Sequence, residues 1–136
     1  MNVLKVSIGV IFILCACKDS HENFTGVWQQ KNTKQSQCKS ELRIKYSKGV
    51  YHIDKKYYND KLAKESYSNM VKDYFSGKTK VKPFRDTKCS TAFYQTISIS
   101  AKYLNENTLA GNGISFLFEK GEIKSGNEIY VKQKEI

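Results

Sequence analysis

The four cysteines and two histidines of this chain have the side chains best suited to nucleophilic, disulfide or zinc chemistry. They are Cys15, Cys17, Cys38, Cys89, His21 and His52. A metal site would need one of the histidines to join two thiolates, and the spacing of these residues matches no familiar ligand pattern. We therefore expect no metal and no cofactor. The first two cysteines end an apolar run, whereas the other two lie in the body of the chain.

The apolar run has the organisation of an export signal. Lys5 supplies a positive charge, and residues 6–14 are apolar except for Ser7 and Gly9. The run is too short to cross a hydrocarbon core, which needs about 20 apolar residues. A short apolar segment behind a positive charge is typical of a secretory signal.

The motif Leu14-Cys15-Ala16-Cys17 resembles the lipobox of bacterial lipoproteins, in which a lipid is joined to the cysteine and the preceding residues are removed. The resemblance implies that residues 1–16 are a lipoprotein signal peptide and that Cys17 is acylated. Residues 17–23 would then form a lipidated tether. The alternative is an ordinary cleaved signal peptide followed by a chance cysteine.

This resemblance predicts that the protein is held to a membrane of the cell envelope by acyl chains. Lys18, rather than Asp, follows the acylated cysteine, which is similar to outer-membrane sorting in enterobacteria-like cells. We expect the outer membrane, with the domain facing either the periplasm or the surface. In that oxidising compartment Cys38 and Cys89 form an even pair, which predicts a disulfide closing a loop of about 50 residues. Such a bond restrains the unfolded chain by roughly 4 kcal/mol in the chain-entropy model.

Catalytic chemistry finds little support in the sequence. His21 falls in the tether, and His52 alternates with Tyr51 and Ile53, so that it faces solvent in a strand. There is no Gly-x-Ser-x-Gly motif, and Gly111-Asn112-Gly113 is too short to cradle a phosphate. We therefore expect a protein that is not an enzyme.

Short segments of alternating polar and apolar residues, separated by turn residues, predict antiparallel strands that form a sandwich or a barrel. The predicted strands cover residues 25–31, 41–46, 50–54, 79–84, 91–101, 108–110, 114–119 and 128–133, with loops at 111–113 and 121–127. Residues 60–76 do not follow this alternation, because their apolar side chains recur at helical spacing. Asn59 is expected to cap this helix, Gly77 to end it, and its apolar stripe to lie on the barrel. The alternative is a lid over a cavity or a helix that contacts a membrane.

Gly26-Val27-Trp28 resembles the Gly-x-Trp motif that opens the first strand of the lipocalin-like group. The resemblance implies an up-and-down antiparallel β-barrel over residues 24–136, with one inserted helix and with Trp28 plugging one end. Lipocalins place an arginine of the last strand over this tryptophan. Here the last strand offers Lys132 or Lys134 instead.

A barrel of about eight strands can be filled by side chains or can hold one small apolar ligand. Large side chains on the predicted strands favour a mostly filled interior with a shallow cleft under the helix. The candidate inward residues are Trp28, Ile44, Tyr46, Tyr51, Ile53, Phe93, Ile97, Ile99, Phe116, Phe118 and Tyr130.

The formal net charge of the 136-residue chain is +10, and removal of residues 1–16 takes away Lys5 and no acid, leaving +9. An exported protein does not meet nucleic acid as its proper target, and the lysines are spread along the chain, as on a solvated surface. The densest basic segment also carries an aromatic residue and is the candidate binding surface. It comprises Lys78, Lys80, Lys82, Phe84, Arg85 and Lys88.

Two functions fit these features. The first is a non-catalytic binding module, held in the envelope by its lipid, for a protein or a small apolar ligand. The second is an inhibitor or immunity protein that blocks a secreted toxin or hydrolase. A wide internal cavity would favour a ligand carrier, whereas a filled barrel with a protruding loop would favour an inhibitor.

Overall fold

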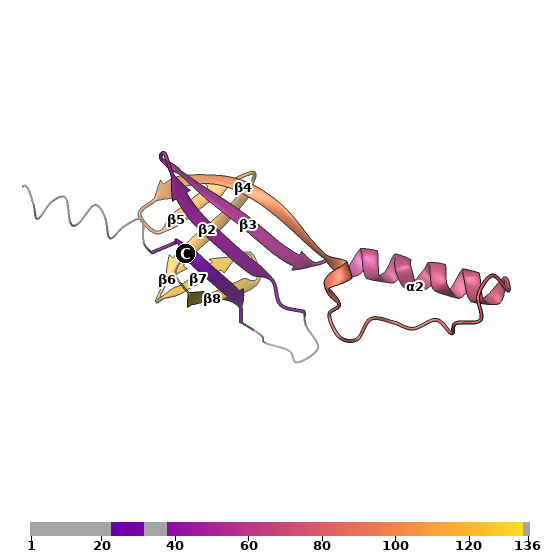
Figure 1. Ribbon diagram of the computed structural model, residues 1–136. Helices are drawn as coiled ribbons and strands as arrows, with labels where there is room; N and C mark the ends of the chain where they lie inside the picture. The colour runs from indigo at the N-terminus through magenta and orange to yellow at the C-terminus, as the bar shows by residue number, and fades with distance from the viewer. Residues whose placement is uncertain (1–22, 32–37, 135–136) are drawn as a thin grey trace, which may run out of the picture.

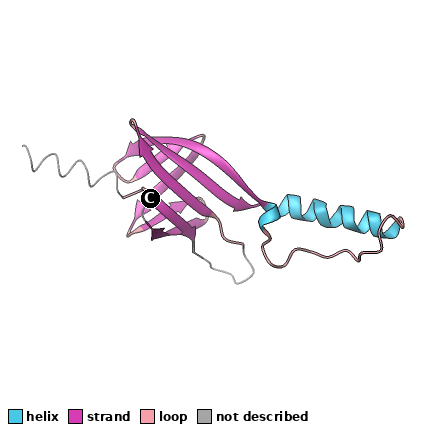
Figure 2. Cartoon of the chain, viewed as in Figure 1, coloured by secondary structure: helices cyan, strands magenta, loops and turns pink. Residues whose placement is uncertain are grey.

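Eight strands close into an antiparallel barrel in the computed structural model, which describes residues 23–31 and 38–134 (Figures 1 and 2). Each strand pairs with its neighbours in chain order, and the last pairs with the first. The elements are β1 (Gly26–Gln30), β2 (Glu41–Ser47), β3 (Val50–Tyr58), α2 (Asp60–Phe75), the 3₁₀ turn η1 (Thr91–Phe93), β4 (Tyr94–Asn105), β5 (Thr108–Gly111), β6 (Ile114–Glu119), β7 (Glu122–Ser125) and β8 (Glu128–Lys134). The predicted up-and-down barrel with one inserted helix is confirmed.

Three hairpins turn through a residue pair in which both φ angles are positive. The pairs are Lys48-Gly49, Asn112-Gly113 and Lys120-Gly121. Such pairs give a hairpin turn whose twist matches that of the flanking strands. The third pair joins β6 to β7, so the predicted loop over residues 121–127 is wrong. β7 is only four residues long, and Gly121 and Gly126 flank it. The sequence therefore suggests one continuous loop.

One apolar core fills the barrel. Seven of the candidate inward residues are buried in it, namely Trp28, Ile44, Tyr51, Ile53, Ile99, Phe116 and Tyr130. The core also contains Phe24, Leu42, Ala101, Leu109 and Ile123, which the sequence reading did not include. Phe118 is partly buried against this cluster.

Three candidate inward residues lie elsewhere. Tyr46 is 37% exposed near the end of β2, where its ring packs on that of Tyr51 with centroids 4.8 Å apart. Ile97 is 39% exposed on β4. Phe93 belongs to η1 and packs edge-on against Tyr58, with ring centroids 6.2 Å apart. Beyond the barrel β3 and β4 continue as a two-stranded ribbon, which carries Ile97 (Figure 1).

The end of the barrel where the chain enters is closed by aromatic rings, and we call it the aromatic end. Phe24 packs on Tyr51, Tyr103 and Phe118, with centroid separations of 5.8, 6.2 and 5.8 Å. The Tyr51 hydroxyl donates to the Tyr103 hydroxyl at 2.7 Å, and burial raises the pKa of Tyr51. Aromatic rings therefore close this end of the barrel.

Trp28 connects this cluster to the last strand. Its indole N–H donates to the Phe24 carbonyl at 2.8 Å, and the Lys132 Nζ lies 5.7 Å from its ring centroid. Lys132 thus occupies the position at which the resemblance expected an arginine. Gly26 is required by the close approach of β8, because a Cβ there would come within 2.7 Å of Lys132 and 2.8 Å of the Lys134 carbonyl.

The opposite end of the barrel is polar. Lys55 Nζ and Glu128 Oε1 are 2.6 Å apart, and the Ser40 hydroxyl donates to the other Glu128 oxygen at 3.2 Å. Burial and the neighbouring Glu128 carboxylate raise the pKa of Tyr130. The ribbon and the helix leave the barrel from this end.

Candidate functional site

Residues 59–93 leave the barrel together, and we call them the arm. Helix α2 runs outward, residues 76–90 return beside it as an irregular limb, and η1 leads into β4 (Figure 1). Asn59 ties the base together: its backbone N–H donates to the Phe93 carbonyl at 2.8 Å, and its side chain donates to Gln95 at 2.8 Å. Its side-chain oxygen also accepts from Leu62 N at 3.1 Å, which confirms the predicted cap.

The helix does not lie on the barrel, so this part of the prediction is wrong. None of its 16 residues is buried, and it extends outward for about 24 Å at 1.5 Å per residue. The predicted strand at residues 79–84 is wrong as well. That segment forms part of the returning limb, where it lies beside a helix and meets no sheet edge with which to pair (Figure 2).

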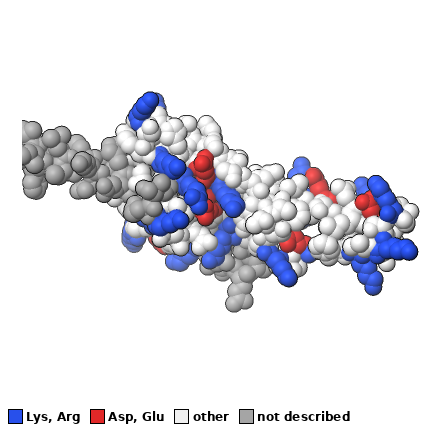
Figure 3. All heavy atoms as spheres, viewed as in Figure 1, with Lys and Arg blue, Asp and Glu red and all other residues white. Residues whose placement is uncertain are grey.

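Residues 72–82 form the tip of the arm. The Lys78 and Thr79 backbone N–H groups donate to the Asp73 carbonyl at 2.9 and 3.3 Å, which turns the chain back after Gly77. Phe75 is 79% exposed and Val81 is 66% exposed. Basic side chains gather at the far end of the molecule (Figure 3).

A disulfide fixes the base of the returning limb. Cys38 and Cys89 are bonded, with their Cα atoms 5.6 Å apart, which confirms the predicted pair. Cys38 precedes β2, so the bond joins the limb to the barrel wall. The Tyr94 hydroxyl adds a second link by donating to the Lys39 carbonyl at 3.1 Å.

Asp86 organises the limb next to the disulfide. Its carboxylate accepts from the Tyr58 hydroxyl at 2.5 Å, from Ser90 N at 2.8 Å and from Lys88 N at 3.3 Å. The Tyr58 hydrogen bond, followed by that from Ser90, lowers the pKa of Asp86. Partial burial and then this hydrogen bond raise the pKa of Tyr58 to about 12. Asp86 is thus a structural carboxylate, which accepts hydrogen bonds from the end of β3 and from its own limb.

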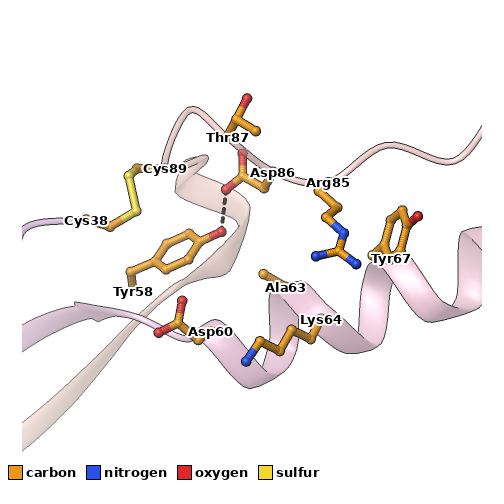
Figure 4. A pocket seen from close by; sticks show the side chains of 10 residues that line it. All are labelled: Cys38, Tyr58, Asp60, Ala63, Lys64, Tyr67, Arg85, Asp86, Thr87 and Cys89. Atoms are coloured by element: carbon orange, nitrogen blue, oxygen red, sulfur yellow. Dashed lines mark hydrogen bonds between the residues drawn. A yellow bond between two sulfur atoms is a disulfide. The ribbon is translucent and has the colours of Figure 1, made fainter. Parts of the chain in front are cut away.

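An open cleft of about 600 Å³ lies between the first turns of α2 and the returning limb (Figure 4). Its lining residues are Cys38, Tyr58, Asp60, Ala63, Lys64, Tyr67, Arg85, Asp86, Thr87 and Cys89. Arg85 projects from the limb towards the helix, and its guanidinium carbon lies 4.8 Å from the Tyr67 ring centroid. This volume is within the range of ligand-binding pockets in proteins.

Arg85 and Lys64 are the cations of this cleft. Within residues 23–31 and 38–134, no carboxylate lies within ion-pair distance of either side chain. Packing against Tyr67 holds the guanidinium in place while its N–H groups stay available to a carboxylate or phosphate, which arginine binds in a bidentate manner. Asp60 lies beside Lys64 on the same wall and limits how much negative charge the cleft accepts (Figure 4).

A smaller apolar cleft of about 240 Å³ adjoins the first. It shares Ala63, Tyr67 and Asp86 with the larger cleft and adds mainly apolar side chains, including Met70, Phe84 and Phe93. Tyr67 therefore lies between a charged compartment and an apolar one. A group that fits both would carry an acidic function next to an apolar one.

The candidate binding residues all lie on the arm, but the structure divides them. Arg85 lines the larger cleft and Phe84 lines the smaller one. Lys78, Lys80 and Lys82 are at the tip, and Lys88 lies outside both clefts. The sequence reading missed the residues that α2 and β3 bring opposite Arg85, chiefly Tyr58, Lys64 and Tyr67. Tyr67 lies in the segment 60–76, whose spacing predicts only an apolar helix face, and the returning limb makes it part of a site.

Other sequence-based candidates have simpler positions. His52 is exposed on β3, paired with Lys45 and Ser100, as expected for a solvent-facing histidine. Cys17, the signal peptide over residues 1–16 and nearly all of the 17–23 tether lie outside the described residues. In the part of the chain that the structure describes, no helix is long and apolar enough to cross a membrane.

Comparison of the chain with models of protein families, with curated proteins and with solved structures found no match.

Proposed function

We propose that this chain is a lipid-anchored, non-catalytic binding protein of the cell envelope, and that the larger cleft of its arm binds a protein partner. One observation carries the proposal. The cleft is fixed to the barrel by a disulfide, and it presents Arg85 without an ion-pair partner among the described residues. A fixed cleft with an available arginine is a site for an acidic group.

The residues around this cleft support a protein partner. Tyrosine and arginine contribute much of the binding energy at protein interfaces, where they act as pre-positioned anchors. Tyr67 and Arg85 already pack together, so little side-chain entropy is lost when a partner binds. An acidic side chain beside an apolar one would fit Arg85 and the smaller cleft together.

The interior of the barrel supports a small apolar ligand less well. The large side chains that point into it are at most 3% exposed and form one continuous cluster, from Phe24 at the aromatic end to Tyr130 near the polar end. Eight strands enclose just enough space for such a core. The binding surface is therefore assigned to the arm.

An acylated Cys17 would be compatible with this arrangement. It lies six residues before Asn23, a reach of about 20 Å for an extended chain. Since the chain enters at the aromatic end and the arm leaves from the polar end, the acyl chains and the cleft would lie at opposite ends of the barrel.

Two charge-matched variants test the cleft. The wild-type chain, Arg85→Gln and Lys88→Gln are each used to recover partners from envelope extract and culture supernatant, with mass spectrometry of the protein and lipid fractions. We expect Arg85→Gln to recover at least ten-fold less of one protein than wild type, because a charged hydrogen bond contributes about 1.5–3 kcal/mol. Lys88→Gln should match wild type. Equal recovery by both variants, or a stoichiometric lipid and no protein, would overturn the assignment.

The anchor has its own test. Metabolic labelling with an alkyne fatty acid should label the wild-type protein, and Cys17→Ser should be unlabelled and either unprocessed or released from membranes. An unlabelled wild-type protein would refute the lipid anchor without affecting the cleft.

An inhibitor or immunity protein is the second candidate, and the shape of the arm favours it. A projection from a rigid barrel suits insertion into the concave site of a toxin or hydrolase. The net charge favours an acidic target. Protection of cells from a co-encoded toxin, lost in Arg85→Gln, would select this function over a general binding role.

A further inference from the structure

The tip of the arm combines exposed apolar side chains with a local excess of positive charge. Phe75 and Val81 are among the most exposed large apolar residues that the structure describes. Tyr74 packs edge-on against Phe75, with ring centroids 5.3 Å apart. The same segment, residues 72–82, carries Lys72, Lys78, Lys80 and Lys82 and a single acid, Asp73.

We propose that this tip docks on a bilayer that contains anionic phospholipid, with the Phe75 and Val81 side chains entering the interface and the lysines contacting lipid phosphates. The site is separate from the proposed protein-binding cleft, and the inference does not rest on that function. Apolar insertion and attraction to anionic headgroups are the two terms that hold peripheral segments to membranes.

The geometry favours a bilayer over a protein groove at this position. The tip is a convex turn at the end of the arm, and both clefts lie nearer the base. In this irregular segment Lys78, Lys80, Val81 and Lys82 are all exposed, so the cations are next to the valine in the chain. Flexible lysine stems let the charged groups reach headgroups while the apolar side chains insert. A fluid bilayer can bind such a surface without a complementary groove.

The experiment uses the unacylated chain beginning at Lys18. This chain contains every core residue, the arm and the disulfide. Binding is measured by flotation with vesicles of phosphatidylethanolamine and phosphatidylglycerol in a 7:3 ratio, and with vesicles of phosphatidylcholine. We expect at least ten-fold stronger partitioning to the anionic vesicles, weakened by added salt.

Variants then separate the two contributions. Lys78→Gln/Lys80→Gln/Lys82→Gln should lower the partition coefficient about 100-fold, since each lysine near an anionic surface contributes about five-fold. Phe75→Ser/Val81→Ser should lower it about ten-fold. Two controls are matched to these changes: Lys45→Gln/Lys48→Gln/Lys102→Gln removes the same charge from the barrel, and Leu104→Ser removes a side chain that is 70% exposed on β4. Both controls should stay within three-fold of wild type.

Three outcomes would overturn the proposal: no preference for anionic vesicles, equal losses in the barrel controls, or full binding by the Phe75→Ser/Val81→Ser variant. Arg85→Gln separates the two proposals, because it should abolish recovery of the protein partner and leave vesicle binding within three-fold of wild type. The control residues Lys45, Lys48, Lys102 and Leu104 lie on barrel strands and turns, and the other substituted residues lie on the arm. An unchanged thermal midpoint will show that each variant is folded.

Discussion

The barrel and the arm use apolar residues in opposite ways. Inside the barrel, Leu42, Ile53 and Leu109 are fully buried, and aromatic rings seal the end where the chain enters. In the arm, a 16-residue helix of similar apolar content buries no side chain, and Phe75 stays 79% exposed. The barrel is therefore held by burial of apolar surface. The arm is held by the Cys38–Cys89 disulfide, by the hydrogen bonds that Asp86 accepts and by its connection to the β3–β4 ribbon.

The exposed apolar residues of the arm are therefore available for binding. Burying a side chain of the size of phenylalanine stabilises a fold by about 1.5–3 kcal/mol, and the arm forgoes that stabilisation at Phe75.

Truncation in the barrel should cost far more than truncation in the arm. We expect Trp28→Ala to lower the free energy of unfolding by about 3–5 kcal/mol, because it leaves a cavity and removes the hydrogen bond to the Phe24 carbonyl. Urea denaturation monitored by circular dichroism measures this loss. A change below 1 kcal/mol would show that Trp28 is not part of a tightly packed core.

Loss of the disulfide should affect the arm before the barrel. The double variant Cys38→Ser/Cys89→Ser should lose about 2–4 kcal/mol, because the bond closes a loop with a sequence separation of 51. Hydrogen exchange should rise most in residues 84–90 and least in β2, β3 and β6. Uniform acceleration over the whole barrel would contradict a separate attachment of the returning limb.

Acid should weaken the same attachment through Asp86. Its pKa is lowered in the folded protein, so its stabilising contribution is fully present above its ordinary pKa of 3.8 and is lost as the pH falls further. The Ser90 amide, which donates to this carboxylate, should report the change by NMR with a midpoint below pH 3.8. In Asp86→Asn the transition should disappear, whereas in Asp73→Asn at the tip it should remain. A wild-type midpoint above 3.8 would be inconsistent with the hydrogen bonds described.

The smallest effect is expected at the tip. Phe75→Ser removes a side chain that buries little, so the free energy of unfolding should change by less than about 0.5 kcal/mol. The same urea titration as for Trp28→Ala provides the measurement. A loss above 1.5 kcal/mol would mean that Phe75 packs within the folded chain and that the tip is not a free surface.

Much of the barrel could be predicted because local rules dictate it. Period-two burial in β2 and β3 and positive-φ turn pairs such as Asn112-Gly113 are visible in the sequence. Burial in a strand also follows from alternation, which is why Ile44, Ile53 and Ile99 were placed correctly. Cysteine parity and the expected oxidising compartment predicted the disulfide.

The position of the arm could not be predicted in the same way. An apolar stripe on a helix indicates that one face avoids water, but not whether the barrel or another segment covers it. Here Phe84, Arg85 and Asp86 of the returning limb face the helix, although the sequence predicts a strand over residues 79–84. The cleft exists only because Arg85 and Tyr67, 18 residues apart in the chain, lie on facing limbs. No local pattern reports such a long-range pairing.

Replacing the arm tests most directly whether it is the binding surface. Residues 59–93 are exchanged for an Asn-Gly turn that joins Tyr58 to Tyr94, and Cys38→Ser removes the unpaired thiol. We expect this barrel to keep its cooperative unfolding transition, because every core residue remains, and to lose recovery of the protein partner at least ten-fold. A folded, arm-less barrel that recovers the partner as well as wild type would contradict the account and return the binding site to the barrel.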